Sequence, residues 1–270
     1  MSEIETVFSK SGNKAGWIEI DNFPVPNRAM NFGDGLFETM VFDQDHIRFS
    51  NHHIARLHHG LDVLNLDGNN VDFEGLESFL NRNFFGQKLR IRWNVFRSGS
   101  GKYTPQSSST DQTIQVSKFI SAPKTKLTAF ISDRIRLFPT AWSACKTLNS
   151  LPYILANQER VKAKMDEVIL LDYRGFLSEA GSSNLFWRKG GEFFTPSLDC
   201  SCLNGIARKV ILEELIKLEL PIQVGDLLPQ ELLSAEQVWV CNVTGISYLA
   251  QIEQKEYSTE RLSIFQNLFE

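Results

Sequence analysis

The stretch EVILLDYRGFLSEAGSSNLFWRKGGEFFTP, residues 167–196, contains the clearest structural signals in this chain. Two runs rich in β-forming residues flank the turn Tyr173-Arg174-Gly175, and two more flank Lys189-Gly190-Gly191. Short apolar runs separated by glycine-containing turns are typical of β-hairpins. The stretch therefore predicts two consecutive hairpins, with strands at EVILLD, FLSEA, NLFW and EFFTP.

Helical periodicity recurs in four places along the chain. Apolar residues three or four apart predict an amphipathic helix within SNHHIARLHHGLDVLNL, residues 50–66. The same pattern predicts three more helices, over 72–85, 151–163 and 205–220. Further β-rich runs predict a possible N-terminal hairpin around WIEIDN (17–22) and strands in RIRWNVFRSG (90–99), TIQVSKFIS (113–121), LTAFISDRIRLF (127–138) and QVWVCNV (237–243).

Length and composition predict two domains of ordinary size. The 270 residues are 42% hydrophobic, which is enough for a substantial core. Apolar periodicity gives way to Pro, Ser and Lys in the segment ISAPKTK, which is typical of a linker. The mixture of helices and strands predicts an α/β fold of the α+β type. We expect an N-terminal α/β domain over 1–118, a linker over 119–126 and a C-terminal domain over 127–270.

Charge and cysteine content narrow the function classes. A net charge of −4 and a pI near 5.8 argue against a surface for nucleic acid or acidic membranes, so a small-molecule site is the better expectation. No apolar run follows Met1-Ser2-Glu3 and no stretch has the length of a membrane span, which predicts a cytoplasmic location. The four cysteines lack paired spacing, so we expect reduced thiols.

Three features between Lys146 and Arg208 suit a pyridoxal phosphate site. Lys146 lies in AWSACKTLNSLPY among small and apolar neighbours, where a partly desolvated amine is nucleophilic. Glu179 precedes a run of small residues that allow a flat group to approach the backbone, and a carboxylate keeps a pyridine nitrogen protonated. The turn Asn204-Gly205-Ile206 opens a predicted helix whose backbone N–H groups suit a phosphate.

Each of these residues also has an ordinary structural interpretation. Most lysines are solvated surface charges, Glu179 could be a solvated acid on an edge strand, and most Gly-led helix starts are plain turns. Cys145 beside Lys146 is more typical of a small buried hydrophobe than of a nucleophile. The histidines between 46 and 59 invite a metal site, but adjacent histidines on a helix point in different directions, so we predict none.

Several motifs in matching order give the chain a family resemblance. They are NRAMNFGDGLFETM (27–40), NHHIARL (51–57), KTLNSL (146–151), DYRGFLSEAGSSNLFW (172–187), TPSLDCSCLNGIAR (195–208) and CNVTG (241–245). Together they resemble the fold type IV pyridoxal phosphate enzymes, which include branched-chain and D-amino-acid aminotransferases and 4-amino-4-deoxychorismate lyase. The resemblance implies a small N-terminal α/β sandwich, a larger C-terminal pseudo-barrel domain, a homodimer and a small-molecule amino substrate.

The resemblance also implies roles for particular residues. Lys146 would be catalytic and would hold the cofactor. The other cofactor-binding residues would be Arg56, Glu179, Ser182, Ser183, Asn184, Gly205, Ile206, Ala207, Asn242 and Thr244. Phe37 and Thr39 would wall the substrate pocket, although a strand start with core residues explains them as well. Arg97 and Lys102 would bind substrate carboxylates, although a solvated hairpin loop gives the same composition.

Within the family, three details resemble the lyase. The run from NLFWRKG to LNGIAR is similar to the enteric type of that enzyme. Ser150 and Leu151 stand where aminotransferases usually have a tyrosine, and Ala207 stands where many have a threonine. These details predict conversion of 4-amino-4-deoxychorismate to 4-aminobenzoate and pyruvate, in folate biosynthesis. The alternatives are a class IV aminotransferase for branched-chain or D-amino acids and a non-catalytic homologue that binds pyridoxal phosphate.

Overall fold

A computed structural model describes residues 6–11 and 16–269, and their contacts divide the chain into two compact units. The first unit contains the chain up to Ile120 together with Cys145–Asn149, and the second contains Ser121–Ala144 and the chain from Ser150 onward. The return of Cys145–Asn149 to the first unit is not anticipated by a single linker over 119–126. It follows from main-chain bonding, since Leu36 and Thr147 form an antiparallel bridge.

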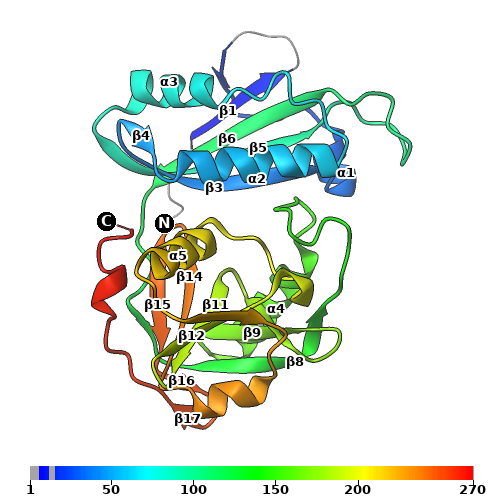
Figure 1. The fold of residues 1–270 in the computed structure, drawn as a ribbon. Coiled ribbons are helices and arrows are strands. Elements are labelled where there is room, and N and C mark those ends of the chain that lie inside the picture. The colour runs from blue at the N-terminus through cyan, green and yellow to red at the C-terminus, as the bar shows by residue number, and fades with distance from the viewer. Residues whose placement is uncertain (1–5, 12–15, 270) are drawn as a thin grey trace. The chain divides into compact units, whose positions relative to one another are not determined.

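The first unit is built on a six-stranded antiparallel sheet in the order β2-β1-β6-β5-β3-β4 (Figure 1). Its strands are β1 (Thr6–Ser11), β2 (Ile18–Glu19), β3 (Gly35–Gln44), β4 (His46–Ile47), β5 (Gln87–Arg97) and β6 (Thr110–Lys118). A short helix, α1 (Arg28–Phe32), precedes β3. The pairing of β1 with β2 confirms the expected N-terminal strand pair; residues 12–15 between these strands lie outside the described residues.

Helices α2 (Ser50–Val63) and α3 (Phe73–Phe84) form, as predicted, and complete the core of the first unit. Met40 of β3 and Trp93 of β5 are fully buried in one cluster with Leu57 of α2 and Leu80 of α3. Because side chains alternate along a strand, residues next to these in sequence point to the other face of the sheet. That second face carries the reactive residues described below.

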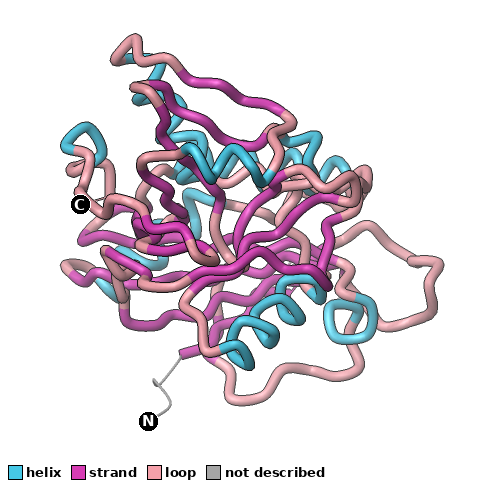
Figure 2. Tube along the Cα trace, turned by 90° about the horizontal axis from the view of Figure 1, so that it is seen from below, coloured by secondary structure: helices cyan, strands magenta, loops and turns pink. Residues whose placement is uncertain are grey.

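The second unit is built on an eleven-stranded mixed sheet. Its strands are β7 (Thr125–Lys126), β8 (Ala129–Leu137), β9 (Glu167–Asp172), β10 (Leu177–Ala180), β11 (Asn184–Lys189), β12 (Glu192–Pro196), β13 (Ile222–Gly225), β14 (Gln237–Asn242), β15 (Gly245–Leu249), β16 (Gln251–Ile252) and β17 (Lys255–Glu256). Antiparallel pairing of β9 with β10 and of β11 with β12 confirms both predicted hairpins. The strands of both units are drawn in magenta in Figure 2.

Both faces of this second sheet are buried. Along β11, Leu185 and Trp187 belong to one apolar cluster, while Phe186 packs with Trp239 in another. Helices α4 (Leu151–Ala163) and α5 (Ile206–Lys217) form where predicted, and α5 packs Ile211 into the Phe186 cluster. Helix α5 ends three residues before the expected limit of 220. The chain has turned by Glu219, whose φ of 54° is left-handed.

Short 3-10 helices complete the second unit: η1 (Leu198–Cys200), η2 (Pro229–Ser234) and η3 (Ser263–Phe265). The four cysteines are buried and unbridged, as the sequence predicted. Across the described part of the chain, every helix is too short or too polar to cross a membrane. The mixed α/β class with two units is the architecture expected from the sequence.

Candidate active site

Lys146 is fixed to the start of β3 by its own main chain. The carbonyl of Lys146 accepts a hydrogen bond from the N–H of Phe37 at 2.8 Å, and the N–H of Leu148 donates to the carbonyl of Gly35 at 2.9 Å. The half-buried side chain places its Nζ 4.5 Å from the centre of the Phe37 ring. A cation over an aromatic face is attracted by the ring's negative face. The predicted nucleophile therefore has a defined position beside a predicted pocket residue.

Arg92 lies against the same aromatic ring and was not among the residues expected from the sequence. Its guanidinium carbon is 3.8 Å from the centre of the Phe37 ring, and its Nε donates to Oδ1 of Asn94 at 3.0 Å. Thr39 is its register partner on β3. The signal was the alternation in RIRWN, which puts Arg92 on the face opposite the buried Trp93. The structure thus brings Phe37, Thr39, Arg92 and Lys146 together on one face.

Arg97 serves the fold of the first unit. It is buried, and its Nε donates to Asp34 at 3.0 Å while its Nη2 donates to the carbonyl of Leu64 at 2.7 Å. Its Nη1 donates to the carbonyl of Asn65 at 3.0 Å. These bonds hold the strand end to neighbouring loops, so we do not retain Arg97 as a carboxylate-binding residue. Lys102 has an exposed side chain in the following loop, and its substrate role stays a prediction.

A buried ion cluster holds Arg56. Its Nε donates to Oε1 of Glu38 at 2.8 Å and its Nη2 to Oε2 at 2.5 Å, while Nδ1 of His53 lies 2.7 Å from Oε2. Burial by itself would raise the pKa of Glu38, but the charge of Arg56 and the contacts of His53 outweigh it and lower the pKa to about 2. Glu38, which the sequence reasoning missed, therefore stays ionised and orients the predicted phosphate-binding arginine.

Glu179 is buried in β10, an interior strand between β9 and β11. Its Oε1 accepts hydrogen bonds from the hydroxyl of Tyr153 at 2.6 Å and the N–H of Leu203 at 3.1 Å. Its Oε2 accepts a longer bond from Nδ2 of Asn184 at 3.3 Å. Glu179 is therefore not a solvated acid on an edge strand. The carboxylate is surrounded by donors that favour its charged form.

The start of α5 is a buried helix N-terminus without a side-chain cap. Gly205 occupies the cap position, and a Cβ there would lie 1.9 Å from Oδ1 of Asn184. The next two residues, Ile206 and Ala207, are buried. Helix N-termini leave backbone N–H groups without intrahelical partners and carry a positive dipole end, which suits an anion. Asn184 links this turn to Glu179, since its Nδ2 also donates to the carbonyl of Leu203 at 2.9 Å.

Asn242 joins the remaining predicted cofactor residues into one hydrogen-bonded set. Its Nδ2 donates to Oγ of Ser183 at 3.1 Å and to the carbonyl of Ser182 at 3.4 Å. Its Oδ1 accepts bonds from the N–H of Thr244 at 2.9 Å and from Oγ1 of Thr244 at 2.6 Å. The loop after β10 and the turn after β14 are therefore held together.

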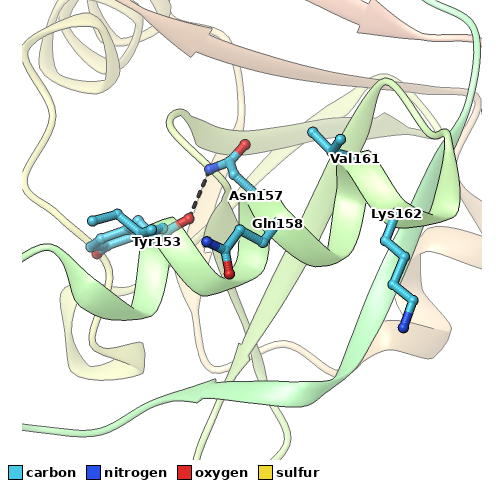
Figure 3. A pocket seen from close by; sticks show the side chains of 6 residues that line it. Tyr153, Asn157, Gln158, Val161 and Lys162 are labelled. Carbon is cyan, nitrogen blue, oxygen red and sulfur yellow. Dashed lines mark hydrogen bonds between the residues drawn. The ribbon is translucent and has the colours of Figure 1, made fainter.

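The outer face of α4 carries a separate open hollow. It is lined by Tyr153, Ile154, Asn157, Gln158, Val161 and Lys162 (Figure 3). Tyr153 connects this hollow to the buried Glu179. The chemistry-bearing residues described above otherwise lie elsewhere, so the hollow is not the candidate active site.

The donor groups fit pyridoxal phosphate. The first unit supplies an amine, Lys146, at a fixed position, and the second supplies a buried carboxylate, Glu179. The second unit also supplies the buried, uncapped start of α5, which matches a phosphate. An amine, a carboxylate and a phosphate-binding turn are the groups that this cofactor requires.

Known proteins share both the sequence pattern and the fold. The model of the family described as Amino-transferase class IV matches residues 35–252. An aminodeoxychorismate lyase from Bacillus subtilis is 29% identical over 85% of this chain and 81% of its own length. A D-alanine aminotransferase from Bacillus licheniformis is 27% identical over 82% of this chain and 79% of its own length. The branched-chain aminotransferase structure from Escherichia coli superposes with a TM-score of 0.85 at 21% identity, covering 97% of this chain and 91% of that chain.

The fold and the donor set thus define a pyridoxal phosphate-dependent enzyme of fold type IV. The match over most of its length shows that the chain belongs to the class IV aminotransferase family. Both expectations from the sequence are confirmed, and with them the choice of an enzyme over a non-catalytic binding homologue. The individual roles of the cofactor-binding residues remain predictions.

Proposed function

We propose that this enzyme is a lyase that converts 4-amino-4-deoxychorismate into 4-aminobenzoate and pyruvate. The observation that carries the proposal is the placement of Arg92 and Lys146 on one aromatic ring, that of Phe37. Both products keep a carboxylate, so the substrate carries two. A second cation beside the reactive lysine matches a substrate with a second negative charge.

Two further observations support the lyase. The Bacillus subtilis relative is named as an aminodeoxychorismate lyase and matches along most of this chain. Ser150 occupies the position four residues after the lysine, where the resembled aminotransferases usually have a tyrosine. Ser150 is half-buried just before α4, so a short side chain stands where a phenol would otherwise contact the cofactor.

Lys146 carries the proton transfers in this proposal. The chemistry that pyridoxal phosphate supplies is withdrawal of electrons from the carbon that bears the substrate amine. The free amine of Lys146 takes the proton from that carbon and then, as an ammonium group, donates it to the oxygen of the departing enolpyruvate. Glu179 keeps the pyridine nitrogen protonated. Release of pyruvate leaves an aromatic ring, which drives the reaction forward.

Three groups would hold the cofactor phosphate. Arg56 offers a planar, permanently charged guanidinium fixed by Glu38. The N–H groups of Ile206 and Ala207 open α5, and they compensate for the hydroxyl that Ala207 lacks. Thr244, held by Asn242, adds a hydroxyl. We also propose a cytoplasmic homodimer, as the family resemblance implies.

The test compares two reactions of the purified enzyme loaded with pyridoxal phosphate. Release of 4-aminobenzoate from 4-amino-4-deoxychorismate is measured beside formation of pyridoxamine phosphate from a panel of L- and D-amino acids. Fast release of 4-aminobenzoate with slow transamination is the expected result. Fast transamination without 4-aminobenzoate would overturn the proposal.

The second candidate is an amino-acid aminotransferase of the same family. It is favoured by the D-alanine aminotransferase from Bacillus licheniformis, whose identity to this chain is only slightly below that of the lyase. Lys146 and Glu179 would act in the same way in both reactions. Fast formation of pyridoxamine phosphate from branched-chain or D-amino acids, with slow release of 4-aminobenzoate, is the result that would support this candidate.

A further inference from the structure

Tyr153 of the second unit has no role in the reaction proposed above, yet it contacts the proposed pyridine-binding carboxylate. It lies in the first turn of α4, and its hydroxyl donates a short hydrogen bond of 2.6 Å to Oε1 of Glu179. Leu203 and Asn184 also donate to this carboxylate, at 3.1 and 3.3 Å. The phenol is therefore a close hydrogen-bond donor to the proposed pyridine-binding carboxylate.

Helix α4 is tied to the strand of Glu179 by a second bond one turn later. Nδ2 of Asn157 donates to the carbonyl of Gly181 at 2.9 Å. It also donates to the carbonyl of Tyr153 at 2.9 Å, the bond drawn in Figure 3. A Cβ on Gly181 would come within 3.0 Å of the Asn157 amide, so the helix approaches this backbone closely. Residues four apart lie on one face of a helix, so Tyr153 and Asn157 bond to Glu179 and Gly181 from the same face of α4.

Donors from two other segments of the second unit join Tyr153 at this carboxylate. The N–H of Leu203 donates to Oε1, as Tyr153 does, and Nδ2 of Asn184 donates to Oε2. These donors fix the plane of the carboxylate and stabilise its negative charge. An ionised, oriented carboxylate suits a protonated pyridine nitrogen, which is a strong donor.

We propose that Tyr153 is a positioning residue that holds Glu179 ionised and oriented for the pyridine nitrogen of the cofactor. This inference rests on the role proposed above for Glu179. It does not depend on whether the reaction is lyase or aminotransferase chemistry. Neither the motifs nor the periodicity of the sequence pointed to this residue.

The phenol is suited to act as a constant donor. Burial, followed by the negative charge of Glu179 and the bond to it, raises the pKa of Tyr153 well above its ordinary value. Cys202 is the other titratable group that acts on the phenol, and burial raises its own pKa as well, so it stays a neutral thiol. The hydroxyl of Tyr153 therefore remains protonated at neutral pH.

The experiment uses the full chain loaded with pyridoxal phosphate and compares Tyr153→Phe with wild type. The control is Tyr173→Phe, which removes a phenol from an exposed turn of the same unit. Two properties are measured: the pH midpoint of the visible absorption of the bound cofactor, and the single-turnover rate of pyridoxamine phosphate formation from an amine donor. We expect Tyr153→Phe to lower the rate about tenfold and to move the midpoint by about half a pH unit or more.

A second substitution keeps the shape of the ring. Replacing Tyr153 with 3-fluorotyrosine strengthens the donor, so the midpoint should move in the direction opposite to that of Tyr153→Phe. A lowered melting temperature with an unchanged midpoint and rate in both variants would reduce Tyr153 to a structural residue and overturn the inference. Loss of 4-aminobenzoate formation in wild type, with the midpoint shifts intact, would overturn the lyase proposal alone.

Discussion

Glu38 of β3 and Arg56 of α2 form a two-point contact in the buried core of the first unit, with Nε to Oε1 at 2.8 Å and Nη2 to Oε2 at 2.5 Å. The planar fork of a guanidinium matches the two oxygens of a carboxylate, so the contact fixes both side chains. His53 adds a third member at 2.7 Å. The helix that carries the predicted phosphate-binding arginine is thereby locked to the strand that leads from Phe37.

Removal of the Glu38 charge should destabilise the protein. Glu38→Gln leaves Arg56 buried with a weakened partner, so the free energy of unfolding should fall by roughly 3–5 kcal/mol. Urea unfolding followed by circular dichroism measures this change. The control is Glu74→Gln on the exposed face of α3, which should stay within about 0.5 kcal/mol of wild type. Equal stability of the two variants would refute the structural role of this pair.

Acid should destabilise the same cluster in two pH windows. Burial lowers the pKa of His53 below its ordinary value of 6.5, so below pH 6.5 the unfolded state gains a proton that the folded state resists. Glu38, lowered from 4.5 to about 2, contributes about 3 kcal/mol above pH 4.5, and this contribution is lost between pH 4.5 and 2. Unfolding free energies measured from pH 8 downward should decline in both windows. Glu38→Gln should abolish the lower one.

Loss of the Lys146 amine should stop catalysis without affecting the fold. Lys146→Ala removes the proposed proton carrier, so turnover should fall by more than about a thousandfold. Borohydride treatment of the loaded wild type, followed by peptide mass spectrometry, should place the trapped cofactor on Lys146. Lys162→Ala, on the exposed last turn of α4, serves as the control and should leave turnover unchanged. Substantial activity of Lys146→Ala would remove this lysine from its role.

Substitutions of Arg92 and Arg97, both in β5, should have different effects. Arg92→Ala should raise the KM for 4-amino-4-deoxychorismate about tenfold or more, because a charged hydrogen bond to a substrate carboxylate is lost, with little effect on stability. Arg97→Ala should instead lower the free energy of unfolding by roughly 2 kcal/mol or more, since Asp34 and two loop carbonyls lose a buried partner. The reverse pattern of kinetics and stability would restore Arg97 as the substrate residue.

A side chain at position 205 should damage the phosphate turn. Gly205→Ala puts a methyl group where Oδ1 of Asn184 lies, 1.9 Å away, so Asn184 must release its bonds to Leu203 and Glu179. The dissociation constant for pyridoxal phosphate should rise about tenfold, and overpacking should cost roughly 1–3 kcal/mol of stability. Gly225→Ala is the control, because its nearest neighbour is 4.0 Å away. Unchanged cofactor titrations would count against this turn.

Much of the fold could be predicted because its signals are local. The hairpins around Gly175 and Gly190 follow from turn residues between apolar runs, and α2, α3, α4 and α5 follow from helical spacing. The C-terminal end of α5 was predicted less accurately, because nothing in the amino-acid composition indicates that Glu219 adopts a left-handed backbone conformation. The domain limits were incomplete for a similar reason: the bridge from Leu36 to Thr147 joins residues more than a hundred positions apart.

Some residues of the candidate site could also be predicted from the sequence, and others could not. Lys146, Glu179 and the Gly205 turn were predictable, since each lies in a distinctive short motif. Arg92 and Arg97 are both basic residues of one strand, and only burial and bonding distinguish half-buried Arg92 beside Phe37 from buried Arg97 at the end of the strand. The sequence offered a glycine-rich loop as the carboxylate site, but Arg28 and Asp34 use that loop to hold the unit together.

Periodicity, turn chemistry and motif order are properties of neighbouring residues, so the element types, the α/β class, the cofactor and the family could be predicted before any contact was known. The packed fold was needed to see that Arg92 and Lys146 both lie against the ring of Phe37, that Glu38 orients Arg56 and that Tyr153 donates to Glu179. Those contacts join residues from separate elements. They arise when the packed core brings distant strands and helices within hydrogen-bond distance, and no local pattern encodes that approach.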